Sequence, residues 1–342
     1  MLATRTARSA SPWAVCAIVL LATGLSGDQF LLSVATTTIL WVVLAGGLNL
    51  MMGYGGLANL GIGASYGIGA YAAGLVATRT GLPLVAAFAV AILAAAIVAA
   101  VIAPFVLRTR GLHFAIATLA IGIVATDLFT NLAGLTGGSV GLSGISRPDW
   151  LADPAAMYWF AAAIGFLLLV LFAVYHRSRM ALVLRGVRDD EQLTRSLGFA
   201  VTRYKITAFV LGSACAGLAG ALYAYFIQYV APSEFALAGA SFQAFAIVAF
   251  GGAATVWGPS VGAILLTGLP TFVDLGPQAK MAAYGLALLI VVLAVPEGVV
   301  PGAVRLSRLL RHQFRQRSTP VEKTPSGAET APLPETATRY RG

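Results

Sequence analysis

Charged side chains are scarce in this chain: only 10% of its 342 residues are Asp, Glu, Lys or Arg, whereas 58% are hydrophobic. That apolar fraction exceeds what one soluble core would bury. Cysteine is rare too, and Cys16 and Cys215 both lie in apolar runs, so they indicate nothing about the redox compartment. The composition therefore predicts a polytopic membrane protein.

The sequence also lacks the residues that catalysis or nucleotide binding would need. It has no phosphate-binding loop of the form G-x-x-x-x-G-K-[ST]. Its histidines, His113, His176 and His312, fall near expected cytoplasmic helix ends or in the C-terminal tail, without a Cys, Ser or metal ligand as a partner. We therefore expect no enzyme activity, no catalytic residues, no metal site and no cofactor, and any energy from ATP has to come through another subunit.

One polar island, His176 to Lys205, interrupts the apolar sequence. A charged side chain at the centre of a bilayer costs about 2.5–3.5 kcal/mol, so this island has to lie in water between two membrane-embedded halves. Its charged residues are Arg177, Arg179, Arg185, Arg188, Asp189, Asp190, Glu191, Arg195, Arg203 and Lys205. The predicted organisation is an N-terminal arm (1–12), a first membrane half (13–175), a cytoplasmic loop (176–205), a second membrane half (206–295) and a basic, disordered tail (296–342).

Apolar runs near the length of a membrane-spanning helix, about 20 residues, recur through both halves. They are 13–25, 30–52, 57–77, 82–107, 112–132, 156–175, 206–230, 236–253, 256–275 and 280–295. The runs predict an all-α protein with about ten transmembrane helices, in which a broken or re-entrant helix could lie in the glycine-rich parts. The first run, after Arg5 and Arg8, also resembles a signal peptide, but no A-x-A cleavage site follows, so we favour a retained helix.

The distribution of Lys and Arg supports this topology. With the N-terminus inside, all but three of the 22 Lys and Arg residues lie on the cytoplasmic side, and the exceptions are Arg79, Arg147 and Lys280. Both termini are then cytoplasmic, and the net charge of +9 reflects cytoplasmic loops rather than nucleic-acid binding. In the tail, 305–317 is a basic amphipathic stretch that fits either a lipid surface or a solvated helix end.

Glycine is concentrated between Gly46 and Gly74, where it allows helix backbones to approach closely. Close packing is the plainer interpretation. The functional one is that Asn49, Asn59 and Tyr66 face a substrate path at membrane depth. Asp127 is the clearest ionisable group inside a predicted span, and a water-exposed helix end explains it at least as well as a pathway role.

Within the island, residues 186–197 are expected to form one short helix that stops at Gly198. Glu191 and Arg195 have i,i+4 spacing, while Leu193 and Leu197 form a small apolar ridge. An ordinary solvated loop helix would explain these features, but the ridge and the central place of the segment favour a docking element.

Five stretches match a known family: GLNLMMGYGGLANLGIGASYGIGAY (47–71), RTRGLHFAIATLA (108–120), LTGGSVGLSGI (135–145), the stretch from 184 to 224, and IVAFGGAATVWGPSVGA (247–263). In these stretches the sequence resembles the permease subunits of branched-chain amino acid ABC transporters, specifically the partner with the longer cytoplasmic loop. The resemblance implies a type II-like importer permease in a bacterial inner membrane.

The resemblance also implies partners and site residues. The expected partners are a second homologous permease, two cytoplasmic ATPase subunits, an extracytoplasmic substrate-binding protein and membrane lipid, with no nucleic acid. The coupling helix would dock on an ATPase through Arg188, Asp189, Asp190, Glu191, Leu197 and Gly198. Thr136, Gly137, Gly138 and Ser139 would lie near the mouth of the binding protein and join Asn49, Asn59 and Tyr66 as a substrate pathway.

Some departures from the family pattern bear on the substrate. Ile62 replaces a histidine, Ser65 an aromatic residue and Val140 a polar one, and Ile123 stands where an acidic residue is frequent. Relatives of such permeases also carry urea, short amides or small carboxylates, so these solutes are alternatives to branched-chain amino acids. A stand-alone, ion-coupled secondary transporter is the alternative from another class.

Overall fold

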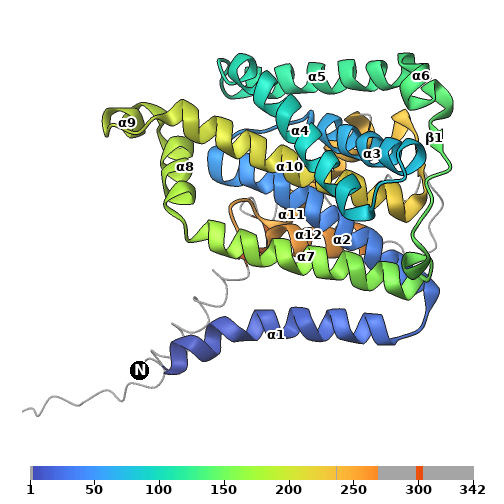
Figure 1. Ribbon diagram of the computed structural model, residues 1–342. Coiled ribbons are helices and arrows are strands. Elements are labelled where there is room, and N and C mark those ends of the chain that lie inside the picture. Colours follow the sequence, from blue (N-terminus) through green and yellow to red (C-terminus); the bar gives the residue numbers. More distant parts are fainter. Residues whose placement is uncertain (1–2, 236, 269–297, 303–342) are drawn as a thin grey trace, which may run out of the picture. The chain divides into compact units, whose positions relative to one another are not determined.

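The computed structural model describes residues 3–235, 237–268 and 298–302, and the regular secondary structure of this part is helical apart from two short strands (Figure 1). The predicted last span, the end of the span before it and most of the tail lie outside the described residues. The long helices are α1 (Ala3–Leu25), α2 (Gln29–Asn49), α3 (Ile62–Arg79), α4 (Leu84–Val106), α5 (Leu112–Asn131), α7 (Pro154–His176), α10 (Val201–Ile227) and α11 (Phe242–Gly251).

Short elements connect or extend these helices. They are the π-helical η1 (Leu50–Tyr54), η5 (Leu237–Ser241) and η6 (Ile264–Gly268), the 3-10 turns η2 (Gly138–Val140), η3 (Asp149–Leu151) and η4 (Pro232–Phe235), α6 (Ala133–Thr136), α8 (Arg179–Asp189), α9 (Glu191–Ser196), α12 (Gly258–Ala263), β1 (Leu142–Ser143) and β2 (Tyr229–Val230). The strands pair antiparallel, Leu142 opposite Val230, and join the loop after α5 to the end of α10.

Six helical segments in the described part are long and apolar enough to cross a membrane. They are Gln29–Tyr54, Leu84–Val106, Leu112–Asn131, Pro154–His176, Val201–Ile227 and Pro232–Gly251, and Trp13–Leu25 and Gly258–Gly268 are shorter apolar helices. Spans of this number and hydropathy identify a multi-pass membrane protein.

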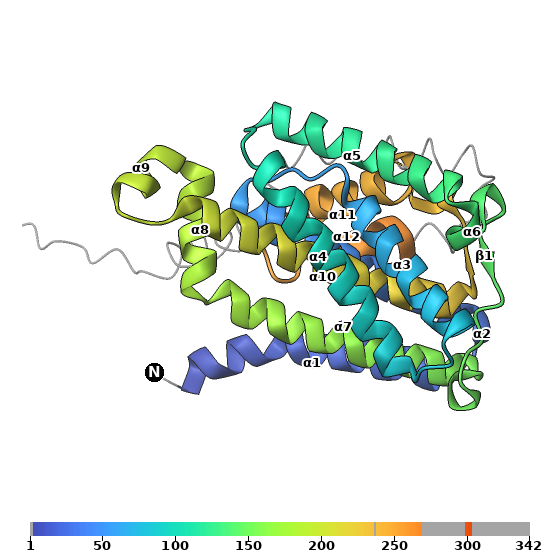
Figure 2. The same cartoon turned by 45° about the horizontal axis from the view of Figure 1, so that its top comes forward.

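Helix α10 packs against α2, α3 and α4, and the two views agree on this arrangement (Figures 1 and 2). The approach is close because glycine faces glycine: a Cβ on Gly69 would collide with the Gly217 backbone, and one on Gly47 with the Gly212 backbone. Close packing of the glycine-rich segment, predicted from its sequence, is thereby confirmed.

The third predicted span, 57–77, starts too early. Helix α2 continues through η1 to Tyr54, and Gly56 then adopts a left-handed φ of 66° that ends it. Asn59 Oδ1 accepts a hydrogen bond from Gly61 N at 2.9 Å, so residues 57–61 form a stabilised loop and α3 begins at Ile62.

Candidate functional site

The polar island folds as two helices, so the expected single helix over 186–197 is wrong. Helix α8 ends at Asp189, and Asp190 is extended (φ −152°, ψ 107°). Its Oδ1 accepts hydrogen bonds from Gln192 N at 2.8 Å and Leu193 N at 2.9 Å, which caps α9. The break occurs because an aspartate is favoured before a helix and disfavoured inside one. The predicted stop is confirmed: Leu197 caps α9 and Gly198 follows with φ 87°.

Helix α8 is amphipathic, and its apolar face holds it on the membrane helices. Ser178 Oγ caps it by accepting from Ala181 N at 3.2 Å. Val183 and Val187 pack against Val201 at the start of α10. The polar α8–α9 unit is therefore a folded projection of α7 and α10 rather than an unstructured loop (Figure 1).

Glu191 is the centre of an ion-pair network that joins three parts of the chain. Its carboxylate lies 2.6 Å from Lys205 Nζ of α10, 3.1 Å from Arg195 of α9 and 3.4 Å from Arg110 of the α4–α5 loop. The Lys205 side chain is only 9% exposed. Burial raises the pKa of the Glu191 carboxyl. The hydrogen bond from Lys205 and the three positive charges together lower it by more than burial raises it, so the pKa lies below its ordinary value.

The end of α8 also contacts the π-helical end of α2. Arg188 Nη1 donates to the Gly53 carbonyl at 2.6 Å. The Arg185 guanidinium lies over the Tyr54 ring, 5.2 Å from its centroid, and His176 Nδ1 is 2.8 Å from the Tyr54 hydroxyl. Any displacement of α8 therefore acts directly on α2.

The six residues expected to contact an ATPase divide into two groups. Asp189, Leu197 and Gly198 are exposed, and Leu197 is 67% exposed. Arg188 and Asp190 are exposed as well, but they and partly buried Glu191 also make contacts within the chain. Leu193 is 59% exposed and extends this outward surface. It was not among the six predicted contact residues, although its place in the apolar ridge could have indicated it. The ion pairs of Arg110 and Lys205 with Glu191 could not be predicted from the local sequence, because they arise from tertiary contacts.

The structure does not bring the residues of the predicted substrate pathway together. Asn49 is buried and holds α2 to the turn before α12: its Oδ1 accepts from Ala254 N and its Nδ2 donates to Thr255 O, both at 2.9 Å. Asn59 and Tyr66 line two separate cavities.

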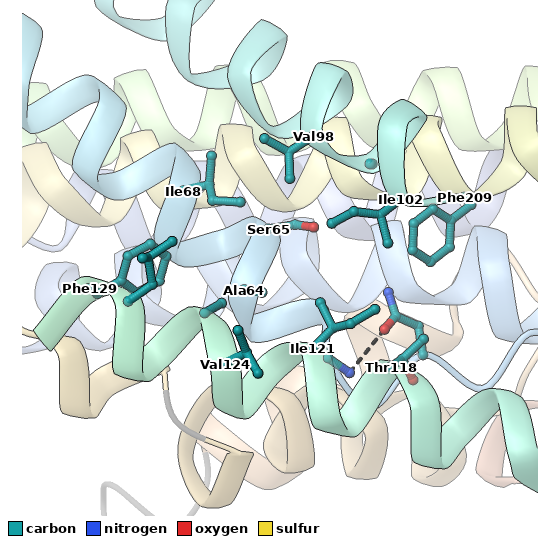
Figure 3. Close-up of a pocket in the computed structure, with 15 residues that line it drawn as sticks. Ala64, Ser65, Ile68, Val98, Ile102, Thr118, Ile121, Val124, Phe129 and Phe209 are labelled. Atoms are coloured by element: carbon teal, nitrogen blue, oxygen red, sulfur yellow. Dashed lines mark hydrogen bonds between the residues drawn. The ribbon is translucent and has the colours of Figure 1, made fainter. Parts of the chain in front are cut away.

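The cavity beside Asn59 lies between α3, α4 and α5 and measures about 290 Å³ (Figure 3). Its walls are mainly aliphatic, and Figure 3 shows Ser65 among Ile68, Val98 and Ile102. Ser65 is one of the departures from the family pattern, and its small side chain leaves space that an aromatic ring would occupy. The chemistry of this cavity suits an apolar group.

The cavity beside Tyr66, about 190 Å³, lies between α2, α3, α10 and the segment from η4 to α11. Its lining is more polar and includes Thr37, Tyr223, Glu234 and Gln243. None of these four was predicted, because single polar residues in separate apolar runs show no pattern until the helices are packed.

The predicted outer residues Thr136 to Ser139 form an ordered turn and line neither of these two cavities. Buried Thr136 donates to the Phe129 carbonyl at 2.6 Å, while Gly137 and Gly138 have φ of 80° and 64°. Ser139 is exposed, and the neighbouring Val140 carbonyl accepts from the Tyr229 hydroxyl at 2.6 Å. The turn thus presents a surface rather than a pocket.

Comparison with known proteins agrees with this architecture. The family described as a branched-chain amino acid transport system, permease component, matches residues 30–295. The chain is 31% identical over 295 residues to the high-affinity branched-chain amino acid transport system permease protein LivM of Salmonella typhimurium strain LT2, covering 78% of this chain and 69% of the relative.

The LivM protein of Escherichia coli K12 shows the same identity and coverage. The high-affinity branched-chain amino acid transport system permease protein LivH of that strain is 25% identical over 284 residues, covering 76% of this chain and 91% of the relative. With most of its length matched, the chain belongs to the family of branched-chain amino acid transport system permease components.

Proposed function

We propose that this protein is the membrane-spanning translocation subunit of an ATP-driven importer of branched-chain amino acids or related small polar solutes, without catalysis of its own. One observation carries the proposal. The exposed tip made by Leu193 and Leu197 stands on a unit held to α10 by Glu191–Lys205 and to α2 by Arg188–Gly53. A partner that moves this tip therefore moves two central helices.

The partners are a second homologous permease, two ATPase subunits on the cytoplasmic side and an extracytoplasmic binding protein. ATP binding closes the ATPases, shifts α8 and α9, and switches the permease pair between outward-open and inward-open states. The residues of this chain that contact the ATPase are Asp189, Leu193, Leu197 and Gly198. The α8–α9 unit is positioned by Arg188, Asp190 and Glu191. In this proposal the protein is a type II-like permease with about ten spans, lies in the bacterial inner membrane and has both termini in the cytoplasm.

The printed names of the relatives support branched-chain amino acids as the substrate. The aliphatic cavity beside Ser65 supports the same assignment, because it suits an alkyl side chain better than urea or a short amide. The outer turn from Thr136 to Ser139 faces the binding protein.

Transport by reconstituted vesicles tests the proposal. The chain is incorporated with its partner permease, with or without the ATPases, and binding protein loaded with radiolabelled leucine is supplied outside. We expect uptake only when ATPases and internal ATP are both present. Uptake driven by a proton or sodium gradient without the ATPases would instead establish a secondary transporter.

A further inference from the structure

The cavity beside Tyr66 combines one carboxylate with several aromatic rings. Trp41, Tyr66, Tyr223 and Phe226 contribute the rings, and Glu234 contributes the carboxylate. Of the described residues that line this cavity, none is Lys, Arg or His. The described part of the lining therefore carries one negative charge, on the exposed Glu234, and aromatic faces add further attraction for a cation.

The aromatic wall is held in place by its own packing. The Tyr66 and Tyr223 rings meet edge to face with centroids 5.6 Å apart, and both contact buried Phe235, at 5.2 Å and 5.9 Å. A wall fixed in this way loses little side-chain freedom when a ligand enters, which favours binding.

The polar lining matches the hydrogen-bonding needs of a primary ammonium group. Such a group has three N–H donors and no acceptor. Thr37, which lines the cavity, donates its hydroxyl hydrogen to the Ser33 carbonyl (Oγ1 to O, 3.0 Å), so its oxygen can act toward a ligand only as an acceptor. The Glu234 carboxylate and the Gln243 amide oxygen provide further acceptors.

We propose that this cavity is a subsite for the ammonium group of an amino acid, with Glu234 as its counter-ion and Thr37 and Gln243 as supporting acceptors. The inference rests on the proposed transport function and adds a selectivity to it. A free carboxylate is repelled by Glu234, and neutral urea gains nothing from the charge. A cavity of about 190 Å³ suits a small solute rather than a peptide.

The test is equilibrium binding to the full chain, purified with its partner permease in lipid nanodiscs without ATPases. Four probes separate the contributions of the ammonium and carboxylate groups. Leucine carries both groups, and urea carries neither. The amine 3-methylbutylamine keeps the ammonium and lacks the carboxylate, whereas 4-methylpentanoate keeps the carboxylate and lacks the ammonium. Calorimetry gives the affinities, and quenching of Trp41 fluorescence, with Trp41→Phe as the reference, reports occupancy of this cavity. We expect leucine and the amine to bind, and the carboxylate and urea to bind at least about tenfold more weakly.

Glu234→Gln keeps the shape of the side chain and removes its charge, and it should weaken binding of leucine and the amine about tenfold. Asp153→Asn neutralises an exposed carboxylate before α7 outside this cavity and should change nothing. Thr37→Val, which deletes one acceptor, should have a smaller effect than Glu234→Gln.

Three results would overturn the assignment: 4-methylpentanoate binding as tightly as leucine, unchanged affinities in Glu234→Gln, or no binding of either ammonium probe. The binding assay does not depend on the energy source. Gradient-driven uptake without ATPases would therefore refute the proposed function but not the ammonium subsite. ATP-driven uptake together with unchanged ligand affinity of Glu234→Gln would refute only the subsite.

Discussion

Glu191 and Lys205 meet at 2.6 Å, and the two side chains are only 17% and 9% exposed. In water such a pair contributes little, but a partly buried charge that loses its partner carries a desolvation penalty. Glu191 is therefore a positioning residue: it fixes α9 relative to α10 and to Arg110.

The pair can be tested by removing one or both charges. We expect Glu191→Gln to lower the free energy of unfolding by about 1–3 kcal/mol, because it leaves the Lys205 ammonium without an anionic partner. Lys205→Met in the same chain should recover most of that loss, since no buried charge then remains. Thermal unfolding midpoints of the purified variants provide the measurement. Asp189→Asn is the control, and a double variant less stable than Glu191→Gln would contradict this account.

The same carboxylate predicts a dependence on pH. Because its pKa is lower in the folded protein than the ordinary 4.5, its stabilisation is fully present above pH 4.5 and is lost as the pH falls through the folded value. We expect the difference in unfolding midpoint between the native chain and Glu191→Gln to be constant from about pH 8 to about pH 5 and to shrink below 4.5. A difference that grows on acidification would show that another group dominates.

At the level of whole elements, hydropathy is enough to locate the apolar helices. The run 82–107 is observed as Leu84–Val106, and the run 112–132 as Leu112–Asn131, because a helix of that length and hydropathy has few alternatives in a membrane. The break at Asp190 was not predictable in this way, since it depends on one side chain capping one turn. The role of Asn49 was also hidden, because its partner Thr255 lies 206 residues away in the sequence.

The exposed ridge of α9 gives a prediction at this scale. Leu193 and Leu197 are exposed in the chain itself, so replacing both with Ser should leave the free energy of unfolding within about 0.5 kcal/mol of the native value. If the ridge docks on an ATPase, the same change should weaken co-purification of that subunit and reduce uptake at least about tenfold. Leu182→Ser, at a residue 69% exposed on α8, is the matched control. Normal uptake in the α9 variant would place the ATPase contact elsewhere.

At the scale of the whole molecule, the described contacts connect the α8–α9 projection to the packed apolar helices. Arg188 and Arg185 of α8 contact Gly53 and Tyr54 at the end of α2, and Asn49 joins α2 to the turn before α12. Lys205 lies near the start of α10, the helix that packs against α2, α3 and α4. Both cavities border helices of this group. A shift of the projection thus reaches the walls of the two cavities through packed helices rather than through loops.

The proposed topology places the α9 tip and the turn from Thr136 to Ser139 on opposite sides of the membrane. We expect a membrane-impermeant maleimide to label Ser143→Cys, in β1, from outside intact cells, and to label Ser196→Cys, at the end of α9, only after permeabilisation. Both variants are made in a chain carrying Cys16→Ala and Cys215→Ala, and both sites are exposed, so access is decided by sidedness rather than burial. Ser326→Cys in the tail extends the test to the second half of the chain. Four predicted spans after the island place Ser326 on the same side of the membrane as Ser196. Labelling of Ser326→Cys from outside would require an odd number of spans after the island and would refute the ten-span topology with both termini inside.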